Sequence, residues 1–308
     1  MSDEADLIDV EDRFKATLDK FGRTYQTYSL EREINLAPVD DEEGFRLEQQ
    51  HDLVKDILGD ALSDAWPHHG LYPSFVGEPR DVLDCGFGTA SWCAEVAEYD
   101  PDCLVIGLDI ALHLATDFPE NCSLEIADLN ETITLASSSI DFVHSRFIAG
   151  GLSRYRWPGY LSDLFRTLRD GGWIQLMEWD LSFRSNNGED DKLQALREWT
   201  RLYYMALDQS RQPAGKRLTQ VTQLEDMLRT ARFQNVSTRS IEVPTCGWDS
   251  RSKKIGEKNL ANMQALIEAV ARYPVLSRGL TDPATFEQIL SAARAELALE
   301  SAQPFLRL

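Results

Sequence analysis

The stretch of residues 81–92 reads Asp81-Val82-Leu83-Asp84-Cys85-Gly86-Phe87-Gly88-Thr89-Ala90-Ser91-Trp92. It predicts a buried parallel strand, a tight glycine turn and the first turn of a helix. Two glycines separated by one residue allow a sharp turn and let a ligand approach the main chain closely. The pattern indicates a nucleotide-like ligand, and an ordinary strand-to-helix turn is the alternative.

Two neighbours of the glycines distinguish between nucleotide-like ligands. A dinucleotide fingerprint has a third glycine where this chain has Ser91, and its turn receives a pyrophosphate at a helix N-terminus. Asp84 at the end of the strand would repel a pyrophosphate but would suit a ligand that carries an ammonium and a sulfonium group. The stretch therefore favours S-adenosylmethionine (SAM) over NAD.

Two further strands are predicted to end in acids. The apolar run 103–109 ends at Asp109, and the run 123–128 ends at Asp128. An acid after the second strand can accept hydrogen bonds from both ribose hydroxyls, and Asp128 could accept from an adenine amino group. A fourth run, 140–145, is followed by Arg146. Because ligands of open α/β sheets bind beyond the carboxyl ends of the strands, these residues predict one cofactor site.

On these motifs the sequence resembles the class I SAM-dependent methyltransferases, and within them the LaeA-like fungal family. The resemblance extends to Gly22-Arg23-Thr24-Tyr25, to the run from Asp41-Glu42-Glu43 through Arg46-Leu47 to Gln50-His51, and to Gly171-Gly172-Trp173. The chain departs from the family pattern in three ways. Phe87 stands between the glycines where a Thr is usual, Thr89-Ala90 follows where the family has another glycine, and Gln26 stands where a His is common.

The resemblance implies an α/β, Rossmann-like fold with a seven-stranded sheet in the order 3-2-1-4-5-7-6 and the last strand antiparallel. It also implies helical additions at both ends of the chain that form a lid. On this basis residues 1–66 are a lid segment, residues 67–180 the SAM-binding core, and residues 181–308 the rest of the core with helical insertions on the substrate side. Within residues 1–30, Phe14, Leu18 and Phe21 suggest a short amphipathic helix, with a mobile acidic arm as the alternative.

The predicted site residues follow from the motifs and the resemblance together. Those expected to bind the cofactor are Tyr25, Asp84, Gly86, Phe87, Gly88, Asp109, Ile110, Asp128, Leu129 and Arg146. Those expected to contact the substrate are Arg23, Tyr28, Trp179 and Tyr203. Tyr203 could instead simply pack on the sheet, and either arginine could hold a carboxylate.

Methyl transfer from a sulfonium is an in-line displacement, so positioning and exclusion of water are the main tasks of the enzyme. A phenol, alcohol or protonated amine also needs a base. His144 and Glu178 are the two candidates for that base. His144 lies in a strand-like run and could equally be a packed residue, and no metal site is predicted.

Composition excludes several classes of function. A net charge of −20 opposes binding to nucleic acid. No apolar run approaches the roughly 20 residues that span a bilayer, and the acidic start is unlike a signal peptide. Five cysteines without a C-x-x-C pair predict free thiols. We therefore expect a cytoplasmic protein.

The sequence predicts a SAM-dependent methyltransferase that acts on a small secondary metabolite. Two alternatives stay open. One is a LaeA-like regulator of secondary metabolism, which would have a protein partner and could be nuclear. The other is a SAM-binding pseudo-methyltransferase.

Overall fold

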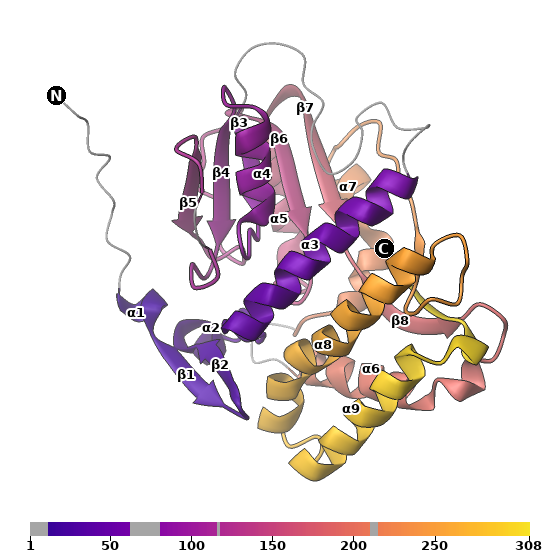
Figure 1. The fold of residues 1–308 in the computed structure, drawn as a ribbon. Coiled ribbons are helices and arrows are strands. Elements are labelled where there is room, and N and C mark those ends of the chain that lie inside the picture. The colour runs from indigo at the N-terminus through magenta and orange to yellow at the C-terminus, as the bar shows by residue number, and fades with distance from the viewer. Residues whose placement is uncertain (1–11, 62–80, 116–117, 210–214) are drawn as a thin grey trace.

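The structure is a computed structural model that describes residues 12–61, 81–115, 118–209 and 215–308. Its centre is a parallel sheet of five strands in the order β5-β4-β3-β6-β7 (Figure 1). The strands are β3 (Asp81–Cys85), β4 (Leu104–Asp109), β5 (Cys122–Ile126), β6 (Ile140–Arg146) and β7 (Leu168–Met177). This order places the predicted first strand at the switch point of a doubly wound sheet, where ligands bind.

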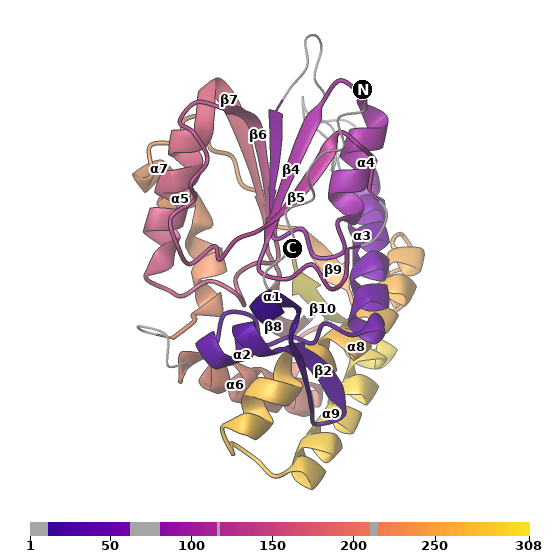
Figure 2. The ribbon, with the colours of Figure 1, turned by 90° about the vertical axis from the view of Figure 1, so that its left-hand side faces the viewer.

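Helices cover both faces of this sheet, as Figure 2 shows from the side. On one face α4 (Ser91–Tyr99) buries Trp92, Cys93 and Val96. On the other, α5 (Arg156–Thr167) buries a stripe that includes Tyr160, Leu161 and Leu164. A sheet buried on both faces explains why its strands read as apolar runs rather than as alternating patterns.

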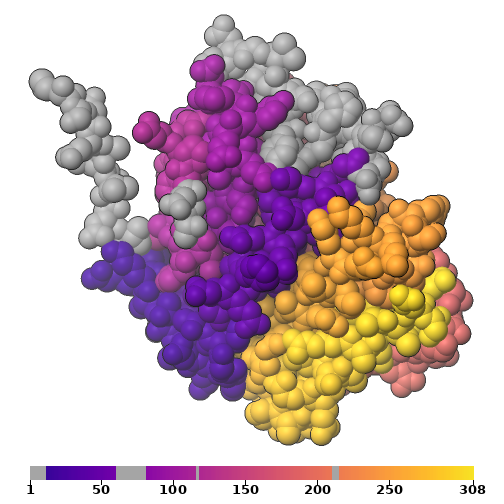
Figure 3. Space-filling view, in the orientation of Figure 1, coloured from indigo at the N-terminus to yellow at the C-terminus, as the bar shows by residue number. Residues whose placement is uncertain are grey.

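A second, largely helical layer lies beyond the carboxyl ends of the parallel strands (Figure 1). It is formed by α3 (Asp41–Ala61), α6 (Gln194–Asp208), α8 (Lys253–Ser277) and α9 (Pro283–Leu297). Helices α3 and α8 lie side by side on the face that Figure 3 shows. The helical additions that the resemblance implies are therefore present, and they lie at the end of the sheet where a ligand would bind.

The last strands do not join the central sheet. They form a separate antiparallel sheet in the order β8-β10-β9, made of β8 (Asp180–Ser185), β9 (Glu242–Pro244) and β10 (Pro304–Arg307). The closing strand is antiparallel as expected, but the described residues do not form one continuous seven-stranded sheet. The interruption lies at Glu178 and Trp179, between β7 and β8, where Glu178 bonds to the loop after β6 and Trp179 stacks on Phe147 at 5.6 Å between ring centroids.

The N-terminal segment differs from the helix that its apolar spacing suggested. It folds into a short α1 (Asp12–Lys15), a hairpin of β1 (Thr17–Lys20) and β2 (Arg23–Gln26), and then α2 (Thr27–Arg32). The turn at Phe21 and Gly22 has positive φ angles of 52° and 79°, which suit a tight hairpin. Turn geometry therefore outweighs helical periodicity here.

Helix α7 (Leu224–Thr230) packs near α5, and all five cysteines are buried free thiols, as predicted. No helix within the described ranges has the length and apolar character needed to cross a membrane. The predicted boundary between residues 66 and 67 lies outside the described residues.

Candidate functional site

The glycine turn after β3 forms the floor of the site. Gly86 and Gly88 have φ angles of 84° and 56°, and the Gly86 amide donates to the carbonyl of Leu108 on the neighbouring strand (2.7 Å). A Cβ atom added to Gly86 would lie 2.5 Å from Cγ2 of Ile148. Position 86 therefore admits only glycine, for both its backbone angle and its space.

Asp109 at the end of β4 is bound to this turn. Its Oδ2 accepts from the amide of Gly88 (2.9 Å) and its Oδ1 from the amide of Ala111 (3.2 Å). Burial raises the pKa of Asp109, and these backbone N–H groups oppose the shift. The carboxylate is thus held rigidly beside the glycine turn, as a ribose-binding acid requires.

A cavity of about 250 Å³ opens over the turn and Asp109. Many of the predicted site residues line it, from both the cofactor and the substrate groups. They are Gly86, Phe87, Gly88, Asp109, Ile110, Leu129, Arg146, Glu178, Trp179 and Tyr203. The structure therefore brings together residues from the ends of all five parallel strands and from helix α6.

Asp84 was expected to contact the cofactor, but it lies behind the turn and does not line the cavity. It is only 2% exposed, and its Oδ2 accepts from Sγ of Cys93 (3.2 Å). Burial raises the pKa of Asp84 to about 7, against the opposing effect of Arg146. Its side chain belongs to the packed layer between β3 and α4.

Asp128 also stands behind the cavity wall rather than on it. Its Oδ1 accepts from the amide (2.9 Å) and the side chain (3.0 Å) of Asn130, and Asn130 does line the cavity. The side chain of Asn130 in turn donates to the carbonyl of Gly151 (2.9 Å) and accepts from the amide of Ser153 (2.8 Å). Asp128 therefore orients a lining residue that the sequence reasoning missed.

His144 is a packed residue, which was the alternative to its role as a base. It is fully buried, its ring stacks on Trp92 at 4.1 Å between centroids, and Nδ1 lies 3.0 Å from Oε1 of Gln175. Burial lowers the pKa of His144 well below its usual range. A neutral imidazole under the sheet cannot reach an acceptor in the cavity.

Three predicted residues of the N-terminal segment hold that segment in place and are absent from the cavity wall. Arg23 forms a two-fold ion pair with Asp40 (2.6 and 2.8 Å). Tyr25 is fully buried against Tyr273, with ring centroids 5.1 Å apart, and Tyr28 packs against Phe14 at 4.6 Å. The part of this region that does line the cavity is the strap, which we define as residues 34–39.

Helix α3 supplies a polar wall to which no role was assigned from the sequence. The guanidinium of Arg46 donates to both carboxyl oxygens of Glu43 (2.8 and 2.7 Å) and to Oε1 of Gln50 (3.0 Å). All three side chains line the cavity and are 4% exposed or less. Their spacing of three and four residues puts them on one helix face, and this spacing is the signal that could have found them.

Lys216 is a second residue that the sequence did not reveal. Its Nζ donates to the carbonyl of Ile34 in the strap and to the carbonyl of Gly150 in the loop after β6 (2.7 Å). The side chain is 2% exposed, and burial lowers the pKa of Lys216 to about 7. Because Ile34 and Gly150 both line the cavity, Lys216 joins two of its walls.

With the glycine turn, the fixed acid and the cavity at the switch point in place, the comparison with known families is decisive: residues 51–238 match one family model, described as a methyltransferase domain. The chain belongs to this methyltransferase family. The match begins within α3 and ends before β9, so it contains the whole central sheet of the methyltransferase domain.

Curated relatives of the methyltransferase are fungal. The chain is 27% identical to the methyltransferase cpsF of Aspergillus campestris, over 75% of this chain and 82% of that protein. It is also 27% identical to the protein-methionine methyltransferase laeA of Emericella nidulans, over 80% of this chain. The chain spans 62% of the length of that laeA relative.

Solved structures are more distant. The [4+2]-cyclase SpnF is 14% identical with a TM-score of 0.44, covering 89% of this chain and 96% of that one. The phosphoethanolamine N-methyltransferase 2 of Haemonchus contortus, in complex with SAM, is 15% identical with a TM-score of 0.40, covering 76% of this chain and 49% of that one.

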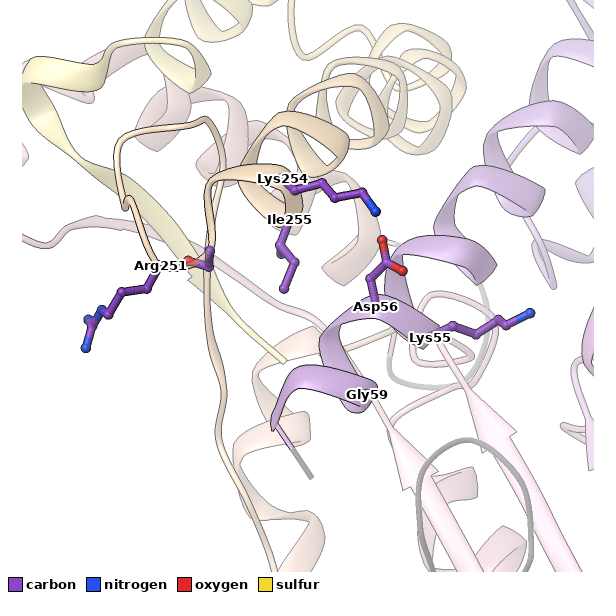
Figure 4. A pocket seen from close by; sticks show the side chains of 7 residues that line it. Lys55, Asp56, Gly59, Arg251, Lys254 and Ile255 are labelled. Carbon is purple, nitrogen blue, oxygen red and sulfur yellow. The ribbon is translucent and has the colours of Figure 1, made fainter. Parts of the chain in front are cut away.

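A second hollow of about 270 Å³ lies away from the sheet of the methyltransferase, between the end of α3 and the start of α8. Figure 4 shows the side chains of Lys254 and Asp56 pointing toward one another across it, whereas Arg251 points away. Its lining residues are Lys55, Asp56, Gly59, Arg251, Ser252, Lys254 and Ile255. Because no strand end contributes to it, this hollow is separate from the cofactor site.

Replacing Lys216 by Met should loosen the strap of the methyltransferase. Two buried carbonyl groups would lose their charged donor, at a cost of about 1–3 kcal/mol. We expect faster hydrogen exchange of the amides in residues 34–39 and roughly tenfold weaker binding of S-adenosylhomocysteine (SAH). Lys192→Met, which removes a half-exposed partner of Glu189, is the control. Unchanged exchange in the strap would show that Lys216 does not hold it.

Proposed function

We propose that this chain is a SAM-dependent methyltransferase that acts on a small molecule. The single observation that supports this most is the continuity of the cavity. The cavity runs from the turn at Gly86 and Gly88, past Asp109, to a largely apolar region between α6 and α8. One continuous space with a cofactor cradle at one end and an apolar region at the other suits a transfer reaction between two bound molecules.

The residues present fit the cofactor. Glycine at position 86 leaves the space that a Cβ atom would fill, and Asp109 offers a fixed carboxylate for two hydroxyl donors. Bound SAM supplies a methyl group on a sulfonium sulfur. The protein's part is to orient that group and to keep water out, and the strap and the loop after β6 supply walls of the cavity for this purpose.

Calorimetry tests the proposal directly. We expect SAM and SAH to bind with micromolar affinity, about −8 kcal/mol. NAD should give no heat, because the turn has Ser91 where a dinucleotide-binding turn has its third glycine. Binding of NAD together with no binding of either SAM form would overturn the assignment.

A regulatory function is the second candidate, because several relatives at 25–27% identity are named secondary metabolism regulator laeA. In that case the methyl acceptor would belong to a protein, the chain would work in a complex, and it would be nuclear rather than cytoplasmic. Recovery of a stoichiometric protein partner by affinity purification from its host, together with methylation of that partner, would favour this candidate over the small-molecule enzyme.

A further inference from the structure

The part of the cavity beyond the cofactor cradle is walled by apolar side chains. They come from β8, from helices α6 and α8, and from the segment before α7, and they are Leu181, Tyr203, Leu207, Leu218, Leu266 and Val270. Most of them belong to the main hydrophobic core. We name this region the acceptor chamber. Its lining selects a molecule with a largely apolar body, since a polar one would lose hydration without compensation.

The charged side chains on the cavity wall are mostly engaged with protein groups. Arg46 is bound by both carboxyl oxygens of Glu43, and Arg146 donates from Nη2 to Nδ1 of His51 (2.8 Å). Asp109 accepts two backbone amides. An anionic acceptor would meet the carboxyl groups of Asp109 and Glu178, and an ammonium would have to be desolvated. A neutral acceptor therefore fits best.

Two charged residues of the wall keep a polar atom without a hydrogen-bond partner among the described residues: Arg146 at its buried Nη1, and Glu178 at one carboxyl oxygen. Oε1 of Glu178 accepts from the amides of Ile148 (2.8 Å) and Ala149 (3.1 Å), which fixes the carboxyl group at the break between β7 and β8. Its second oxygen, Oε2, has no hydrogen-bond partner among the residues that the structure describes. Glu178 thus places a fixed carboxyl group in the wall of the cavity, and one oxygen of that group is available to accept a hydrogen bond from a ligand.

We infer that the acceptor is a neutral, largely apolar molecule with a hydroxyl group, such as a phenol, and that Oε2 of Glu178 takes the proton of this hydroxyl. This inference rests on the proposed methyltransferase function. The acceptor's O–H bond breaks and its proton passes to Glu178. The oxygen forms a bond to the methyl carbon, whose bond to sulfur breaks, and that electron pair remains on the sulfur.

If Glu178 accepts the proton, the methylation rate should depend on pH through the ionisation of its carboxyl group. Burial raises the pKa of Glu178 to about 8, although the amides of Ile148 and Ala149 oppose the shift. The proton-accepting carboxylate is therefore the minor form below pH 8 and the major form above it. Methylation of a neutral phenol should rise as the pH increases through about 8 and then level off.

The experiment compares Glu178→Gln with wild type and uses phenol, 2-naphthol and 4-phenylphenol as probes. Glutamine keeps an oxygen that can accept from the two amides, so SAH affinity should stay within about twofold. Formation of methyl ethers, followed by mass spectrometry, should fall at least about 100-fold, and the rise near pH 8 should disappear. Glu125→Gln, an exposed residue on β5, is the matched control and should behave as wild type.

Binding of the phenol is measured separately from its methylation. In the presence of SAH, 2-naphthol fluorescence should report tighter binding to wild type at pH 8.5 than at pH 6.5, because a carboxylate is the stronger acceptor. The affinity of Glu178→Gln should not change between these pH values.

Two results would overturn the inference. One is wild-type methylation rates in Glu178→Gln, and the other is the failure of all three phenols to bind or be methylated while SAH binds normally. Methylation of 2-naphthylmethylamine in preference to the phenols would also overturn it. If SAH itself did not bind to wild type, the proposed methyltransferase function would fail instead.

Discussion

Replacement of Asp109 by Ala should weaken SAH binding by about 2–4 kcal/mol, roughly 30- to 1,000-fold. In the proposed cofactor site the carboxylate would accept two ribose hydroxyls, and it fixes the turn through the amide of Gly88. Alanine removes both effects, because neither the ligand nor the Gly88 amide keeps its charged acceptor. Isothermal titration with SAH measures the loss.

Asp128→Ala is the matched comparison for this variant. Asp128 acts on the cavity only through Asn130, so we expect the loss of SAH affinity to be about 1 kcal/mol. Circular dichroism should show both variants folded. Equal affinities for Asp109→Ala and wild type would mean that the cofactor does not lie beside the end of β4.

Replacement of Gly256 by Ala should remove about 3 kcal/mol from the free energy of unfolding. Gly256 lies in α8, and a Cβ atom there would come within 2.1 Å of the carbonyl oxygen of Cys246. A backbone carbonyl cannot rotate away as a side chain can, so α8 or the segment after β9 must shift. Urea denaturation followed by circular dichroism measures the effect.

Gly44→Ala in α3 controls for helix propensity. Its Cβ atom would meet only Cδ2 of Leu114, at 3.5 Å, which is an ordinary contact. Alanine is favoured over glycine in a helix by up to about 1 kcal/mol, so this variant should be as stable as wild type or more stable. Similar destabilisation by both substitutions would show that the close contact with Cys246 is not the cause.

The prediction of the parallel sheet succeeded because its signals are local. Each strand appears in the sequence as a short apolar run that ends in an acid or a turn, and the glycine turn needs only Gly86, Gly88 and their neighbours. The hairpin at Phe21 and Gly22 also has a local signal, a glycine that can adopt positive φ, but the helical spacing of Phe14, Leu18 and Phe21 pointed elsewhere. The glycine predicts a turn and the apolar spacing predicts a helix, and the sequence does not show which of the two prevails.

The sequence could not predict the direction in which the side chain at each strand end points. Asp84 and Asp109 end neighbouring strands, yet one accepts from Cys93 inside the protein and the other from Gly88 at the cavity. The two candidate bases differ in the same way: His144 is packed in the interior, and Glu178 lines the cavity. Whether a strand-end side chain faces the cavity or the protein interior depends on which segments pack around it. In this protein those segments are α3, α4 and the strap.

The sequence alone determined the family, the sheet and the position of the glycine turn, because residues close in the chain carry those features. Only the tertiary structure decided which acids reach the cavity, where the sheet divides, and that Lys216 bonds to the carbonyl of Ile34, 182 positions away. The physical reason is that burial, not residue type, sets the partners and the pKa of an ionisable side chain. Burial arises only when distant segments pack together.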